Sequence, residues 1–156
     1  MLAQPNRLTT LGLVSAALFA ISFAHHAPAQ AQQAERKLLH EQDGKAYFVD
    51  ENLNLACTGC RRGVPAGTPV VISKALGPGL SAVASEGKFL ILQENRGTSC
   101  HAGGWYALHL ETLAVKEIKI RSCSEILKDT YTLNKDGSLV VTLTHYDGRK
   151  ISTKLK

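Results

Sequence analysis

Four cysteines carry the most specific chemistry of the sequence, and they are Cys57, Cys60, Cys100 and Cys123. An even number of cysteines in a chain with a secretory signal favours disulfide bonds. We expect Cys57 to pair with Cys60, because Gly59 makes so short a ring easier to close. Cys100 and Cys123 flank a predicted hairpin, which brings the chain back towards its start, so we expect a second bond between them. A Cys57–Cys100 bond remains the alternative.

The spacing Cys57-Thr-Gly-Cys60 is also typical of a redox dithiol. Such a pair needs a lowered thiolate pKa, which comes in most cases from a helix N-terminus. Arg61 and Arg62 would stabilise a thiolate, but the following Gly-Val-Pro does not continue readily as a helix. Thiol–disulfide chemistry centred on Cys57 and Cys60 is therefore the alternative function.

A metal site is the other open interpretation of the same cysteines. Zinc would need Cys100 and either His101 or Cys123 as ligands besides Cys57 and Cys60. A single Cys-x-x-Cys is only half of such a signature, and an oxidising compartment works against it. We predict neither a metal nor a cofactor.

Three segments rich in Gly and Pro are predicted loops, namely 57–68, 76–80 and 99–104. Loops carry function more often than the strands that they join, so we place binding there. The candidate binding residues are Arg61, Arg62, His101 and Trp105. For Trp105 the favoured interpretation is that its ring faces the core and closes the domain over the Cys100 loop, and contact with a partner is the other.

No catalytic residue is assigned. The chain has no Gly-x-Ser-x-Gly nucleophile elbow and no phosphate-binding loop. Glu51 and Glu94 would suit glycoside chemistry as a carboxylate pair. Their equivalent places in an internal repeat instead favour roles in stabilising turns. We therefore expect a binding protein more than an enzyme.

The N-terminus has the three parts of a secretory signal. Arg7 precedes the apolar, uncharged run 8–23, which is shorter than the roughly 20 residues that span a bilayer. Ala29 and Ala31 then supply the small residues that signal peptidase accepts. We expect a signal peptide over 1–31, cleavage after Ala31, a periplasmic or secreted protein, and no membrane span afterwards. An uncleaved anchor helix is the alternative.

The net charge of the whole chain is +5, which is mildly basic. Dense Lys/Arg clusters interleaved with aromatic residues are missing from the sequence, so we expect no nucleic-acid binding. A basic exported domain favours anionic contacts. The partners that we expect are an envelope protein, a cell-wall glycan or an anionic surface.

After a flexible lead-in over 32–36, the apolar residues come in short runs separated by Gly, Pro, Asn and Asp. This pattern predicts strands and one single β domain over 37–156. One helical turn is expected at 124–128. The predicted strands are 37–41, 45–49, 69–74, 80–84, 89–93, 105–110, 115–121, 130–133, 139–145 and 150–155.

A weak internal repeat starts at Gly44 and again at Gly87. Each glycine opens an apolar strand, then Glu-Asn, then a cysteine at the same offset, and a poorer third copy starts at Gly137. Repeats of this length occur in propeller blades, but three are too few to close a ring. We therefore predict an all-β fold, an antiparallel β-meander folded as a sandwich, an open barrel or a blade-like stack.

Three short motifs, at 95–100, 104–108 and 122–124, resemble a scattered group of small signal-bearing proteins of Gram-negative bacteria. In that group a cysteine after a polar turn is followed by an aromatic strand and then by Cys-Ser. The resemblance covers about 87–143. It implies a periplasmic location and a Cys100–Cys123 bond, and it implies no activity.

Overall fold

The computed structural model describes residues 36–77 and 79–156, whose regular structure is almost entirely β. The strands are β1 Lys37–Gln42, β2 Lys45–Val49, β3 Leu55–Thr58, β4 Val70–Ser73, β5 Leu80–Glu86, β6 Phe89–Glu94, β7 Gly104–His109, β8 Val115–Glu117, β9 Ile126–Leu133, β10 Leu139–His145 and β11 Lys150–Leu155. The helical structure of the described residues is one 3-10 turn, Gly97–Ser99. The predicted all-β class is confirmed.

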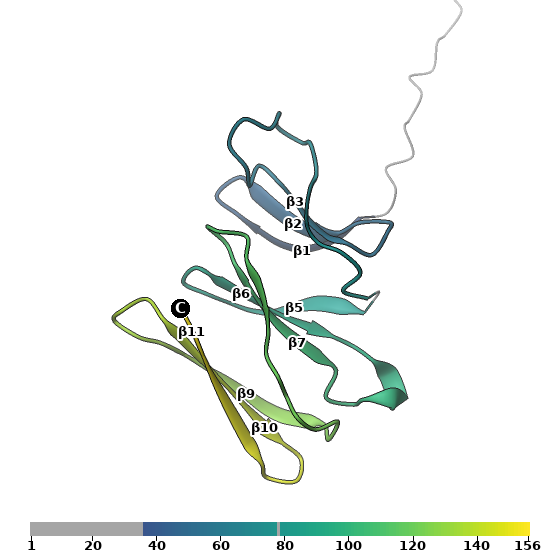
Figure 1. The fold of residues 1–156 in the computed structure, drawn as a ribbon, viewed down its shortest axis with the longest axis vertical. Coiled ribbons are helices and arrows are strands. Elements are labelled where there is room, and N and C mark those ends of the chain that lie inside the picture. Colours follow the sequence, from purple (N-terminus) through teal and green to yellow (C-terminus); the bar gives the residue numbers. More distant parts are fainter. Residues whose placement is uncertain (1–35, 78) are drawn as a thin grey trace, which may run out of the picture. The chain divides into compact units, whose positions relative to one another are not determined.

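The strands form three antiparallel sheets, one after another along the chain (Figure 1). The first sheet has the order β1-β2-β3-β4, the second β5-β6-β7-β8, and the third β9-β10-β11. Within each sheet, strands that follow one another in sequence pair, as in a meander. None of the three sheets closes into a barrel.

The sequence repeat coincides with these sheets. Gly44, Gly87 and Gly137 lie in the turns before β2, β6 and β10, each the second strand of its sheet. Their φ angles are 71°, 59° and 75°, in the left-handed region that a tight hairpin needs and that glycine adopts without strain. Each repeat therefore begins at the first hairpin turn of a sheet, one strand after the sheet itself begins.

The second sheet lies between the other two and is buried on both faces. In β6, Leu90 and Leu92 belong to the core shared with the first sheet, while Phe89 and Ile91 belong to the core shared with the third. Successive side chains of a strand point to opposite faces. The unbroken apolar run of β6 is thus the signature of a central layer.

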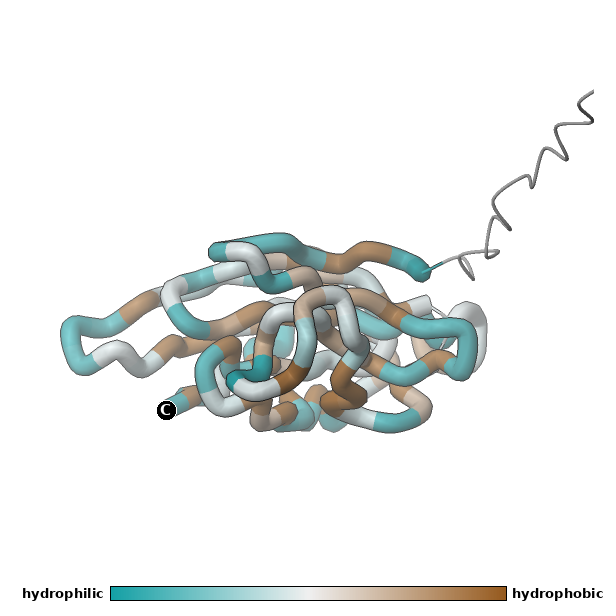
Figure 2. The backbone as a smooth tube through the Cα atoms, turned by 90° about the horizontal axis from the view of Figure 1, so that it is seen from above, coloured by the Kyte–Doolittle hydropathy of each residue, from teal (hydrophilic) through white to brown (hydrophobic). Residues whose placement is uncertain are grey.

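This layering produces two hydrophobic cores. Figure 2 shows that hydrophilic residues gather instead at several of the turns. The first core contains Tyr47, Val49, Leu55, Cys57, Leu80, Leu90, Leu92, Leu108 and Leu110. The second core contains Phe89, Ile91, Trp105, Ala107, Ile118, Leu139, Val141, Leu143 and Leu155. Burying one such large side chain contributes roughly 1.5–3 kcal/mol.

Two local predictions are wrong. The segment 55–58, part of which we assigned to a loop, is the strand β3, because it pairs with β2 on one side and β4 on the other. The helical turn predicted at 124–128 is instead the start of β9, where Ile126 pairs with His145. Strand pairing outweighs the Gly- and Pro-rich loop signal in the first case and the helical signal in the second.

The predicted signal peptide lies outside the described residues, and so does the lead-in except for Arg36. The guanidinium of Arg36 lies 5.0 Å from the centroid of the Phe48 ring. The described residues include no helix long and apolar enough to cross a membrane.

Candidate functional site

The structure pairs Cys57 with Cys60 and Cys100 with Cys123, with Cα–Cα distances of 6.0 and 4.6 Å. This is the pairing that the sequence favours. The bonded sulfurs are not available as thiolate ligands for zinc. Among residues 36–77 and 79–156, no cluster of three or more His, Cys, Asp or Glu side chains is placed to hold a metal. Two disulfides fit an oxidising environment.

The first disulfide fastens the loop after β3 against the β1–β2 turn. Cys57 is fully buried in the first core, whereas Cys60 is half-buried. Between them Gly59 has a φ of 70°, and a Cβ on it would lie 2.5 Å from the carbonyl oxygen of Gly44. Because only glycine fits this approach, the loop leaves the first sheet in one defined position.

Arg61 and Arg62 follow the disulfide directly, and both side chains are exposed. They line an open depression of about 640 Å³ together with Lys45 of β2 and residues 111–113 of the β7–β8 turn. We call this depression the arginine pocket; its lining residues are Lys45, Gly59, Cys60, Arg61, Arg62, Glu111, Thr112 and Leu113. Three cations face a single carboxylate there, so the pocket favours an anionic partner.

The opposite wall of the arginine pocket is the β7–β8 turn, which His109 holds in shape. The Nδ1 atom of His109 accepts the backbone N–H groups of Glu111 and Thr112, each at 3.3 Å. A nitrogen that accepts carries a lone pair, so the ring proton resides on Nε2. The imidazole of His109 is thus engaged in building the turn.

His101 and Trp105 lie away from the arginine pocket. Trp105 is near the start of β7, and the turn that lines the pocket follows the end of the same strand. The ring of Trp105 is only 3% exposed and its Nε1 donates to the carbonyl of Ala102 at 2.8 Å. Trp105 therefore fills the second core and is not a surface contact, while His101 is exposed. The predicted candidates do not form one site.

A polar cluster that we did not predict joins Glu94, Arg96 and Tyr106. The Arg96 Nε donates to Glu94 Oε2 at 2.9 Å, and the Tyr106 hydroxyl donates to the same oxygen at 3.1 Å. The bond to Glu94 raises the pKa of Arg96, and partial burial is the main cause that raises the pKa of Tyr106. The carboxylate of Glu94 is therefore occupied by its neighbours.

Two glycines make room for this cluster. A Cβ on Gly77 would lie 2.1 Å from Glu94 Oε1, and a Cβ on Gly104 would lie 2.7 Å from Glu94 Oε2. Sequence signals for this enclosure were the Gly-rich segments around both positions. The contacts of Glu94 are with the side chains of Arg96 and Tyr106.

The turn-stabilising role that we predicted for Glu51 belongs to its neighbour Asp50. The Oδ1 of Asp50 accepts the N–H groups of Asn52 and Asn54 at 2.9 and 2.8 Å, and Glu51 is exposed. These bonds to Asn54 and Asn52 lower the pKa of Asp50, although burial opposes them. Glu51 and Glu94 therefore do not form a carboxylate pair with equivalent surroundings.

Comparison of the chain with known protein families, with curated proteins and with solved structures found no match.

Proposed function

We propose that this chain is an exported, non-catalytic binding domain that holds an acidic protein of the cell envelope through the loop 57–68. The observation that carries the proposal is the pair of exposed guanidinium groups, Arg61 and Arg62, on a loop anchored by the Cys57–Cys60 bond. A loop anchored in this way loses little conformational freedom on binding. Lys45 adds a third positive charge beside it.

The proposal also accounts for the side chains that would otherwise be candidates for catalysis. Glu94 is bound by Arg96 and Tyr106, and His109 accepts two backbone N–H groups. Polar groups used in this way stabilise a scaffold. A rigid scaffold with charged loops is typical of binding domains.

Export is supported by the secretory pattern of residues 1–31 and by the two disulfides. Of the two locations, the periplasm is the one that we propose, since the sequence resembles small periplasmic proteins.

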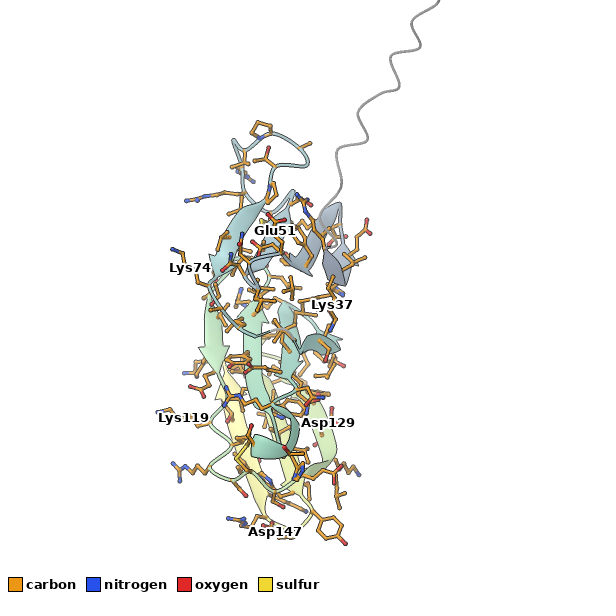
Figure 3. The ribbon with its side chains drawn as sticks, turned by 90° about the vertical axis from the view of Figure 1, so that its right-hand side faces the viewer. Lys37, Glu51, Lys74, Lys119, Asp129 and Asp147 are labelled. Carbon is orange, nitrogen blue, oxygen red and sulfur yellow. A yellow bond between two sulfur atoms is a disulfide. The ribbon has the colours of Figure 1, made fainter. Side chains whose placement is uncertain are left out.

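Capture of envelope proteins by the tagged domain tests the proposal. The variant is Arg61→Gln/Arg62→Gln, and its matched control is Lys74→Gln/Lys119→Gln, which removes two exposed charges elsewhere; Figure 3 shows both lysines extending outward from the fold. We expect the arginine variant to retain less than a tenth of the partner that the wild type retains, and the control to match the wild type. Equal capture by all three proteins, or capture of glycan or anionic vesicles alone, contradicts the proposal.

A second candidate function is thiol–disulfide exchange, and the half-burial of Cys60 beside Arg61 favours it. Nearby cations stabilise a thiolate. Reduction of insulin by the dithiothreitol-reduced protein, lost in Cys60→Ala, would support this function. A reduced wild-type protein that does not reduce insulin would exclude this function.

A further inference from the structure

Within residues 36–77 and 79–156, the third sheet has one strand fewer than each of the other two. The first two sheets contain four strands each, whereas the third ends at β11. No described strand pairs with the outer edge of β11, so nothing there corresponds to β4 or β8. In an antiparallel edge strand, about half of the backbone N–H and C=O groups point away from the sheet. Among the described residues, Lys150–Leu155 has β10 as its strand partner and makes no other backbone–backbone hydrogen bond, so the groups on its outer edge have no strand partner.

Two hollows lie along this strand. One, of about 510 Å³, contacts its end at Leu155 and has Phe89 and Ala107 of the second sheet among its lining residues. The other, of about 270 Å³, contacts its start at Lys150 and Ile151. We call them together the β11 groove. Apart from His145, its walls come from β11, from the second sheet with the β7–β8 turn, and from two connecting segments.

The charges of the β11 groove are all of one sign. Its lysines and arginines are Lys116, Lys154, Lys156, Arg121, Arg149 and Lys150, and no Asp or Glu lines either hollow. Arg149 pairs with Asp147, and Lys154 pairs with Asp136 at 3.3 Å. The other four form no ion pair among the described residues. The groove therefore favours a negatively charged occupant.

His145 of β10 also lines the hollow at the start of β11, although its side chain is only 1% exposed. Its Nδ1 lies 2.8 Å from the carbonyl oxygen of Ser124, and because a carbonyl only accepts, Nδ1 carries the proton. Its Nε2 atom has no hydrogen-bond partner among the described residues. A buried polar atom without a partner is unfavourable.

We propose that an extended, acidic segment of a partner protein adds to β11 as the fourth strand of the third sheet. Open backbone groups favour a polypeptide strand over a glycan, since a strand supplies N–H and C=O groups at the matching spacing. Alternate side chains would face the apolar floor at Phe89, Ala107 and Leu155, and acidic ones would meet the lysines and arginines. The inference rests on the proposed function in one respect, that the partner is a protein.

A synthetic peptide of alternating Glu and Val, six residues long to match β11, tests the proposal with the disulfide-intact protein purified from the periplasm. We expect backbone amide NMR shifts along β11 and at Lys116. We expect Lys116→Glu/Lys150→Glu to weaken binding at least tenfold. The matched control Lys119→Glu/Lys128→Glu reverses two charges outside the groove and should bind like the wild type.

A second peptide separates strand addition from charge attraction. It has the same sequence with methyl groups on alternate backbone nitrogens, which removes the N–H groups of one edge and keeps every charge. We expect its binding to fall at least tenfold. Equal binding of the methylated peptide, shifts centred on Arg61 and Arg62, or no binding of the first peptide overturns the proposal.

The outcome is separable from that of the proposed function. Peptide binding at β11 together with unchanged capture by Arg61→Gln/Arg62→Gln overturns the role of the loop and supports strand addition. Loss of capture in the arginine variant without peptide binding at β11 supports the role of the loop and overturns strand addition.

Discussion

Leu90 and Ile91 are adjacent in β6, and both are fully buried, in different cores. Neighbouring strand residues are seldom both inaccessible, because one face of an antiparallel sheet commonly meets water. This pair therefore defines the second sheet as the layer on which the first and third sheets both pack.

Truncating either residue should destabilise the protein substantially. We expect Leu90→Ala and Ile91→Ala each to lower the free energy of unfolding by about 2–5 kcal/mol, the usual cost of a large-to-small change in a core. Urea denaturation measures the loss. Val83→Ala, at a residue that is 38% exposed, is the control and should cost less than about 1 kcal/mol. A small effect at either core residue would contradict the three-layer arrangement.

The approach of Gly59 to Gly44 predicts a difference between two glycines of the same loop. Gly59→Ala adds a Cβ that clashes with backbone, whereas Gly63 also has a positive φ, of 80°, but nothing within 4 Å of an added Cβ. We expect Gly63→Ala to cost about 1–2 kcal/mol from backbone strain alone, and Gly59→Ala to cost clearly more. Thermal or urea unfolding of both variants decides this. Equal costs would show that the loop is not held against the β1–β2 turn.

The two disulfides should contribute unequally to stability. The chain-entropy relation gives about 3.4 kcal/mol for Cys100–Cys123 and about 1.6 kcal/mol for Cys57–Cys60, since the sequence separations are 23 and 3. We expect Cys100→Ala/Cys123→Ala to unfold at lower urea concentration than Cys57→Ala/Cys60→Ala. The reverse order would indicate that the loop after β3 matters more than the connection before β9.

Acid should reveal the contacts of Asp136. Its carboxylate accepts the Ser138 hydroxyl at 2.5 Å and backbone N–H at 3.0 Å, and Lys154 lies near; these contacts lower the pKa of Asp136 from 3.8 to about 2. A lowered folded pKa adds stability that is present above about pH 4 and is lost as the pH falls through about 2.

We therefore expect the stability difference between wild type and Asp136→Asn to shrink between about pH 4 and pH 2. Denaturation curves across this range measure it. Lys154→Gln, which keeps both bonds from Ser138, should retain most of the pH dependence. A difference that stays constant with pH would contradict the assignment.

Much of the fold was predictable because its signals are local. Asp-Gly and Glu-Gly turns separate short apolar runs, and all ten predicted strands overlap strands of the structure. The strand β3 escaped because Leu55-Ala-Cys-Thr is short and borders a Gly-rich loop. The run Phe89-Leu-Ile-Leu is too apolar for a strand with one solvent-exposed face, which is a sequence signal for the central position of the second sheet.

The sites were less predictable, because they depend on contacts between distant segments. Nothing in the sequence around Lys116 reveals that Leu155 lies beside it in one hollow. The sequence places Gly104 in a loop. Only the structure shows that a Cβ at this position would meet the side chains of Glu94 and Tyr106. The core position of Trp105 was the favoured interpretation from the sequence, and its ring is buried in the second core.

The most direct test of the account is the intact mass of the protein taken from the periplasm and alkylated without reductant. An exported, disulfide-stabilised domain predicts a chain that begins at Gln32 and carries no alkyl groups. A chain that begins at Met1, is found in the cytosol and is alkylated at all four cysteines would contradict the account.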